Sequence, residues 1–123
     1  MKLTNVEMQQ FVTLLEPLLE RNDILGYIAA RNIRTFREAL KEYSEFREKA
    51  ILEFGKHDVD EDGNELPTVS IYPGDENFDK FAAKMSEIMN VEQEVNIVTT
   101  SYENAIGKLN GQQILDLDWM FTD

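Results

Sequence analysis

One stretch of the chain, residues 23–55, constrains the fold more than any other because it has the pattern of a single amphipathic helix. Seven of its residues recur at alternating steps of three and four, which places them on one helical face. They are Ile33, Phe36, Leu40, Tyr43, Arg47, Ala50 and Phe54. Mostly charged residues occupy the opposite face. We therefore predict one long helix over residues 23–55, against which the other elements pack.

A shorter helix is predicted before it. Thr4 and Glu7 have the spacing of a capping box, and apolar residues follow at helical intervals. Pro17 lies inside this pattern, where it removes a backbone donor, so we predict a kink or break near it. Asp23 is placed to cap the long helix. The two helices, joined by a short turn, predict an antiparallel helical hairpin.

The pattern changes to strands after Gly55. Two short runs, residues 56–59 and 66–72, flank a polar segment that ends in Asp62-Gly63-Asn64, and Asp-Gly is typical of a tight β-hairpin turn. Pro67 indicates an edge strand because it cannot donate to a neighbouring strand. Residues 92–100 also read as a strand, which we expect to join the hairpin in a small antiparallel sheet.

Two further helices complete the prediction. Asp75 is placed to cap a helix that runs from Phe78 to an end near Asn90, and Asn110 is placed to cap a C-terminal helix. The predicted fold class is therefore α+β, in a single domain over residues 1–123. Within it we expect a helical hairpin (1–55), a β-hairpin with a helix and a strand (56–100), and a C-terminal helix (101–123).

The net charge of −12 is unevenly placed along the chain. Residues 1–56 hold nine acidic and nine basic residues, whereas residues 57–123 hold fifteen acids against Lys80, Lys84 and Lys108. Such a surface repels nucleic acid and anionic lipid and favours basic partners. We expect a basic protein partner, no direct nucleic-acid binding and no membrane contact. The simpler interpretation is that the charge only keeps the protein in solution.

The sequence favours a protein that is not an enzyme. It has no cysteine, which excludes a thiol nucleophile and thiolate metal ligands, and His57 is its one histidine. Its glycines are scattered, so no glycine-rich phosphate loop is present. Carboxylate pairs such as Asp116 and Asp118 are expected by chance among 24 acids. We therefore predict no catalytic residue, no cofactor and no metal site.

The segment from Asp58 to Gly63 resembles the opening of an EF-hand loop, which places oxygen ligands at its first, third and fifth positions before a glycine. The rest of the motif is missing. Glu65 stands at the eighth position, where an apolar residue is expected, and Val69 stands at the twelfth, where a glutamate is expected. We therefore predict a polar hairpin turn, with weak cation binding as the alternative.

Basic residues on the long helix form a possible ridge: Arg31, Arg34, Arg37 and Lys41. Such a ridge is one way to contact an anion or nucleic acid. Glutamates are interleaved with it, however, and ion pairs at a spacing of four residues stabilise a helix. We therefore predict a solvated face with the pairs Arg34–Glu38, Lys41–Glu45 and Glu45–Lys49.

The chain ends in large apolar residues, including Trp119 and Phe121. A terminal helix docked on the core explains them, and an exposed anchor for a partner is the alternative, since Trp is common at binding hot spots. Combined with the acidic residues, this gives the candidate partner-binding set. Its members are Asp58, Asp60, Glu61, Asp62, Glu65, Asp75, Glu76, Asp116, Asp118 and Trp119.

Four segments carry a resemblance to a known family: MKLTNVEMQ, IAARNIRTFREALKEY, DEDGNE and AIGKLNGQQILDLDWMF. In their order along the chain they resemble a family of small uncharacterised proteins encoded by bacteriophages and prophages of Gram-positive bacteria. The family has no assigned activity, so the resemblance implies a setting and no functional residue. It implies a phage product that acts in the virion or against the host cell.

Two functions follow as hypotheses. The first is a non-catalytic acidic protein in the host cytoplasm that binds and inhibits a host macromolecule, for instance a defence nuclease, in the manner of an anti-CRISPR protein or a nucleic-acid mimic. The second is a virion structural or assembly protein that acts through self-association or other protein contacts. The long helix and the apolar C-terminus motivate the second hypothesis. A homo-oligomer is compatible with both.

Overall fold

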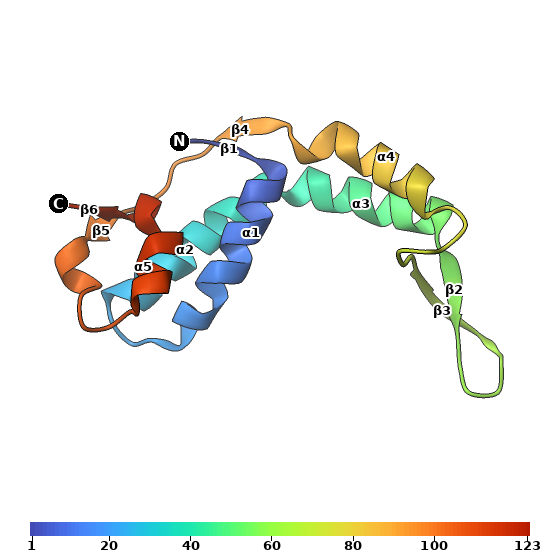
Figure 1. Ribbon diagram of the computed structural model, residues 1–123, viewed down its shortest axis with the longest axis horizontal. Helices are drawn as coiled ribbons and strands as arrows, with labels where there is room; N and C mark the ends of the chain where they lie inside the picture. Colours follow the sequence, from blue (N-terminus) through green and yellow to red (C-terminus); the bar gives the residue numbers. More distant parts are fainter. The chain divides into compact units, whose positions relative to one another are not determined.

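The computed structural model describes residues 1–123 as helices joined to small two-stranded sheets (Figure 1). The predicted α+β class is confirmed. The chain divides into two compact units. We call Met1–Leu40 together with Glu92–Asp123 the terminal unit, and Lys41–Val91 the inserted unit. The single domain of residues 1–123 stays a prediction. No helix has both the length and the apolar character needed to cross a membrane.

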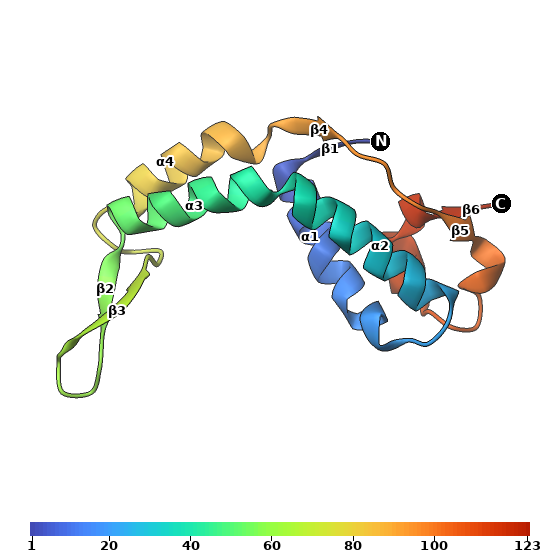
Figure 2. The same ribbon diagram turned by 180° about the vertical axis from the view of Figure 1, so that it is seen from behind.

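The terminal unit consists of three α-helices, three short 3-10 helices and four short strands. In chain order they are β1 (Lys2–Thr4), α1 (Asn5–Leu15), the 3-10 helix η1 (Glu16–Glu20), α2 (Ile24–Ala39), β4 (Glu92–Glu94), β5 (Thr100–Ser101), the 3-10 helix η2 (Tyr102–Asn104), α5 (Gly111–Asp116), the 3-10 helix η3 (Asp118–Met120) and β6 (Phe121–Thr122). Helices α1 and α2 lie side by side in opposite directions, as the predicted hairpin requires (Figures 1 and 2).

Helix α1 begins and ends as the sequence predicts. The Thr4 hydroxyl accepts from the Glu7 amide at 3.1 Å, and the Glu7 carboxylate accepts from the Thr4 amide at 3.0 Å. The helix stops at Leu15, and the chain tightens into η1 with Pro17 in its first turn. Proline has no N–H to continue the α-helical ladder, so the break falls where predicted.

Helix α2 starts at the predicted cap, where the Asp23 carboxylate accepts from the amides of Leu25 and Gly26. Gly26 has a structural reason to be glycine. A Cβ at this position would lie 2.2 Å from the Arg21 carbonyl oxygen, so the backbone approach there excludes a side chain. Arg21 in turn pairs with Asp23 at 2.7 Å.

The predicted long helix is wrong in one respect, because it is two helices. Helix α2 ends at Ala39, and Leu40 follows with φ −89° and ψ 2° before α3 begins at Lys41. The Gln93 side-chain amide donates to the Ala39 carbonyl oxygen at 2.8 Å and to the Asn5 side-chain oxygen at 2.7 Å. A carbonyl at the helix end is therefore satisfied from a distant segment, which apolar spacing does not reveal.

The predicted strand over residues 92–100 is also corrected. Only its two ends are extended: β4 pairs antiparallel with β1, and Thr100, the first residue of β5, pairs in parallel with β6. No strand joins the hairpin. Between β4 and β5 the backbone bonds to a side chain instead. The Asn32 amide donates to the Val98 carbonyl at 3.0 Å and its oxygen accepts from the Val98 amide at 2.8 Å.

The core of the terminal unit lies between α1, α2 and the C-terminal segment. Trp119 packs on Phe11 and Phe36, with ring centroids 5.0 and 5.6 Å away. Asn32 is fully buried in the same core, and its two hydrogen bonds to Val98 offset the cost of burying a polar side chain. The buried apolar residues of this unit include Leu3, Met8, Leu15, Leu18, Leu25, Ile28, Ile33, Phe36, Leu117, Met120 and Phe121.

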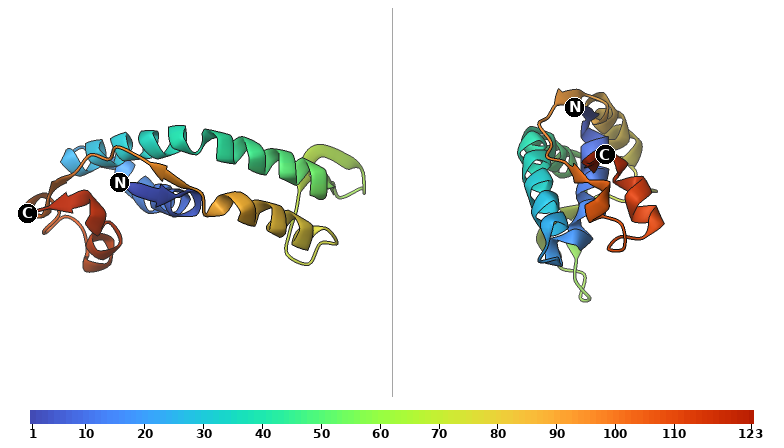
Figure 3. Two further views of the ribbon diagram at one scale, coloured as in Figure 1. Left: turned by 90° about the horizontal axis from the view of Figure 1, so that it is seen from above. Right: turned by 90° about the vertical axis from the view of Figure 1, so that its left-hand side faces the viewer.

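The inserted unit is built from α3 (Lys41–Phe54), β2 (Lys56–Val59), β3 (Glu65–Ser70) and α4 (Phe78–Met89). Helices α3 and α4 run side by side (Figure 3). Lys84 of α4 lies over the rings of Phe46 and Phe54 at 5.8 and 5.7 Å, and its amine pairs with Glu53 at 2.8 Å. The core of this unit is small, with Tyr43, Ala50, Phe81 and Met85 buried.

Gly55 connects α3 to the hairpin. A Cβ there would lie 2.5 Å from the Ile51 carbonyl oxygen and 2.7 Å from that of Ser70, so the junction requires glycine.

The predicted cap of α4 is wrong. The Asp75 carboxylate accepts from the Tyr72 amide at 2.7 Å, and Asn77, at the cap position, makes no side-chain bond to the helix. The end at Asn90 is confirmed.

Candidate interaction surface on the acidic hairpin

The hairpin formed by β2 and β3 extends from the ends of α3 and α4 within the inserted unit (Figure 2). Its two strands pair antiparallel from Lys56–Ser70 to Val59–Glu65, with an irregularity between His57 and Val59. No third strand covers either edge. A two-stranded hairpin has little stability of its own, so its side-chain bonds matter.

The Asp60 carboxylate holds the tip of the hairpin. One of its oxygens accepts from the amides of Asp62 and Asn64, each at 2.9 Å, and the Gly63 amide donates to the Asp60 carbonyl at 3.1 Å. Gly63 has φ +80°, a backbone conformation that favours glycine. These bonds lower the pKa of Asp60, the largest cause being the Asn64 amide. The predicted polar turn is confirmed.

The same bonds explain why this segment is not an EF-hand loop. The Asp60 carboxylate accepts from the backbone amides of Asp62 and Asn64, and the chain continues into β3 instead of a helix. No group of three or more His, Asp or Glu side chains is arranged to hold a metal ion.

Asp58 fastens the two strands together. Its carboxylate accepts from the hydroxyls of Thr68 at 2.6 Å and Ser70 at 3.0 Å. These bonds, that to Thr68 first, lower the pKa of Asp58. His57 adds a bond across the hairpin between its Nδ1 and the Leu66 carbonyl at 2.9 Å. Asp58 and Asp60 therefore have structural roles, which the sequence did not separate from the other acids.

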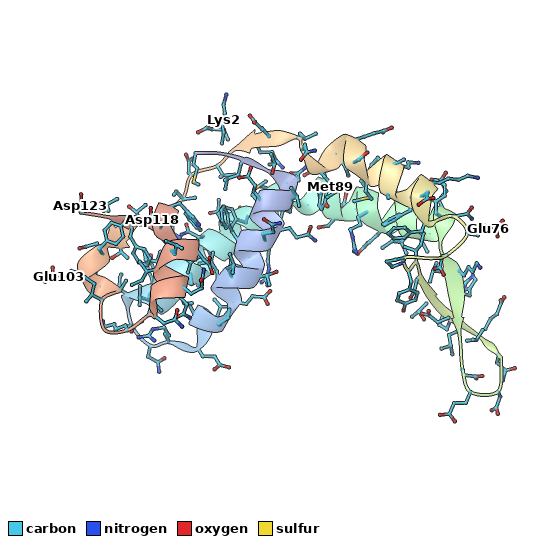
Figure 4. All side chains as sticks on the ribbon, in the orientation of Figure 1. Lys2, Glu76, Met89, Glu103, Asp118 and Asp123 are labelled. Atoms are coloured by element: carbon cyan, nitrogen blue, oxygen red, sulfur yellow. The ribbon has the colours of Figure 1, made fainter.

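The remaining acids of the hairpin face solvent. Glu61, Asp62 and Glu65 are exposed, and their carboxylates have no side-chain partner. Glu76 follows the hairpin and is also exposed (Figure 4). Residues 57–79 hold eight carboxylates and neither lysine nor arginine. Five of the fifteen acids of residues 57–123 thus lie on the hairpin, where Lys56 is the one lysine or arginine.

The other predicted site residues lie in the terminal unit, so the candidate set forms two groups. Asp116 accepts from Gln112 at 2.8 Å, and Asp118 accepts from the Tyr102 hydroxyl. The bond to Asp118 is the main reason that the pKa of Tyr102 is raised. Asp118 lies on the same side of this unit as Glu103 and Asp123, which are also acidic (Figure 4).

Trp119 is docked on the core and is not an exposed anchor. Its ring is half-buried against Phe11 and Phe36, and its indole nitrogen is buried with no hydrogen-bond partner. The C-terminal segment is therefore part of the terminal unit's packing, which supports the first of the two interpretations of its apolar residues.

The ion pairs predicted along the long helix are not formed. The side-chain pairs in the structure are Arg21–Asp23, Arg37–Glu16 and Lys84–Glu53. Lys41 belongs to α3 in the inserted unit, so the predicted basic ridge is interrupted at Leu40. Three exposed arginines remain on α2 without a glutamate partner on that helix: Arg31, Arg34 and Arg37.

No model of a known protein family matches the chain, and comparison with curated proteins and with solved structures found no match.

Proposed function

We propose that this chain is a non-catalytic acidic protein of phage origin that binds a basic groove of a host protein and inhibits it. A defence nuclease is the partner class that fits best, since its nucleic-acid groove is basic. The protein would act in the host cytoplasm and would use no cofactor. The phage setting comes from the sequence resemblance described above.

The observation that carries this proposal is the excess of negative charge on the hairpin, where five acids stand against Lys56. Glu61, Asp62 and Glu65 project into solvent with no cation between residues 57 and 79. A groove that binds phosphates presents lysine and arginine side chains, and carboxylates can occupy the same positions. Complementary charge of this kind favours fast association and selects against acidic partners.

The bonds of Asp58 and Asp60 make the hairpin suitable for this role. Four side-chain and backbone donors hold these two carboxylates in place, so the exposed acids around them are presented on an ordered turn. A surface that is already ordered loses less conformational entropy when it binds.

The experiment compares two variants of equal charge. The hairpin variant carries E61Q, D62N, E65Q and E76Q, and the control variant carries E20Q, E38Q, E45Q and E48Q. All eight residues are exposed, and each variant moves the net charge from −12 to −8. Wild type and both variants are used as bait in a pull-down from lysate of the infected host, and bound proteins are identified by mass spectrometry.

We expect wild type and the control variant to retain the same basic protein and the hairpin variant to lose it. The affinity of the purified pair should then fall steeply between about 50 mM and about 500 mM salt, because exposed charges are screened over this range. Two results would contradict the proposal: equal binding by both variants, or an affinity that salt leaves unchanged.

A further inference from the structure

The exposed side of α2 carries a cluster of positive charge on a chain that is acidic overall. We call Arg31, Arg34 and Arg37 the arginine face. They follow one another at steps of three residues, so they lie on successive turns, and all three are exposed. Helix α2 contains one acidic residue, Glu38. The helix therefore has a local excess of positive charge.

The protein pairs this face with a carboxylate only at Arg37. Arg31 donates to the Tyr27 hydroxyl at 2.9 Å and lies 5.9 Å from the centre of that ring, a contact that leaves its charge intact. Arg34 has no carboxylate within ion-pair distance, and Arg37 reaches the exposed Glu16 at 3.5 Å. Arg31 and Arg34 are therefore free to bind carboxylates from elsewhere, and Arg37 can exchange Glu16 for another carboxylate because an exposed pair of this kind contributes little.

The chain itself presents a matching set of carboxylates. Along the helix the arginine face spans about 9 Å from residue 31 to residue 37. On the hairpin, residues 62 and 65 are at most about 10 Å apart. Exposed apolar side chains flank both surfaces: Tyr27 is 56% exposed beside Arg31, and Val59 is 61% exposed opposite Glu65. The two surfaces are thus opposite in charge, and each has an exposed apolar side chain at its margin.

We propose that the arginine face of one copy of this chain binds the acidic hairpin of a second copy. The two surfaces differ, so the contact is head-to-tail and each bound copy leaves one arginine face and one hairpin open. Association therefore continues into rings or longer assemblies. The net charge of −12 makes two copies repel each other at long range, so the contact is weak. It forms at physiological salt, where the repulsion between charges more than about 8 Å apart is screened.

This proposal does not rest on the proposed function, and its test contains only the full chain. Sedimentation is measured at about 0.15 M salt for protein between about 10 μM and about 1 mM. The average mass of wild type should rise above the 14.3 kDa of one chain as concentration increases. At about 1 M salt, where charges are screened within about 3 Å, it should return to that value.

Two variants each remove one surface. R31E, R34E and R37E together reverse the arginine face, and E61K, D62K and E65K together reverse the exposed hairpin charges while Asp58 and Asp60 remain. Each variant alone should stay a single chain. Mixed in equal amounts, they should associate, because the intact hairpin of the first meets the intact arginine face of the second, and the two reversed surfaces are also opposite in charge.

Charge-matched controls separate this contact from an effect of net charge. R47E, K49E and K80E match the first variant, E20K, E45K and E48K match the second, and all these residues are exposed. Both controls should associate like wild type, and circular dichroism should show the same helix content in every variant. The proposal is overturned if wild type stays a single chain at about 1 mM, if the mixed variants form no complex, if the controls lose association equally, or if association survives about 1 M salt.

Discussion

Replacing Asn32 with alanine should destabilise the terminal unit strongly for a single polar substitution. The side chain is fully buried and makes two hydrogen bonds, at 2.8 and 3.0 Å, to the backbone of Val98. Asn32→Ala removes both bonds, and each contributes about 1 kcal/mol net. It also leaves a half-buried N–H and carbonyl at Val98 without partners, so we expect a total loss of about 2–4 kcal/mol.

Urea unfolding followed by Trp119 fluorescence measures this loss, because that ring packs on Phe36 of the same helix. With a slope of about 1–3 kcal/mol per M, the midpoint should fall by about 1–2 M at an unchanged slope. Asn22→Ala is the matched control, since Asn22 is exposed and makes no such bond. A loss for Asn32→Ala within about 0.5 kcal/mol of the control would refute the reasoning.

A second substitution at the same position tests the direction of the bonds. Asn32→Asp keeps an acceptor for the Val98 amide but sets a carboxylate oxygen against the Val98 carbonyl. It should be destabilised near pH 7 and recover as the pH falls and the carboxyl is protonated, because a protonated carboxyl can donate again. Stability that does not change with pH would show that the donated bond is unimportant.

Three further predictions concern single positions. Gly55→Ala should destabilise the inserted unit by about 1–3 kcal/mol in urea unfolding, because the new methyl group meets two carbonyl oxygens. Gly111→Ala is the control, since a Cβ there has nothing within 4 Å, and it should change stability by less than about 0.5 kcal/mol. The pKa values of Asp58 and Asp60 are lowered from 3.8. The stability that these carboxylates give the hairpin is therefore fully present above that pH and is lost as the pH falls through their lower folded values. Amide NMR spectra should show the hairpin opening in this acidic range, and Asp60→Asn should make this pH-dependent opening smaller. Trp119→Phe should change stability by less than about 1 kcal/mol by circular dichroism, because the smaller ring buries less area but removes a buried N–H that lacks a partner.

Local chemistry allowed much of the fold to be predicted from sequence. The caps at Thr4 and Asp23, the break near Pro17 and the turn at Gly63 each depend on residues close in the chain, and all four are present. Such features follow from backbone dihedral preferences and from short-range hydrogen bonds, which involve only residues close in the chain.

The errors arise where a distant group decides the outcome. The break at Leu40 accompanies a bond from Gln93, and the segment before β5 bonds to Asn32 instead of a strand. The missed cap at Asp75 is an exception, because its carboxylate accepts from the Tyr72 amide, a local partner. Spacing along the chain contains no information about partners more than 50 residues away, so apolar periodicity favoured a continuous helix and a continuous strand.

The candidate site was predictable only in part. The excess of acid could be read from the sequence, but the division of roles between Asp58 and Asp60, which bond internally, and Glu61, which does not, required the structure. The free arginines on α2 were obscured by a rule that pairs charges four residues apart. Exposed side chains of this kind gain little from pairing, so the rule overestimated their ion pairs.

The bond from Gln93 to Ala39 has a consequence for the architecture of the gene product. It holds the point where the chain leaves the terminal unit next to the point where it returns, so residues 41–91 form an insertion whose two ends are close together. A short glycine-rich bridge from residue 40 to residue 92 would close the remaining chain without stretching it. Different modules could therefore be exchanged at this junction while the caps and core on either side are preserved.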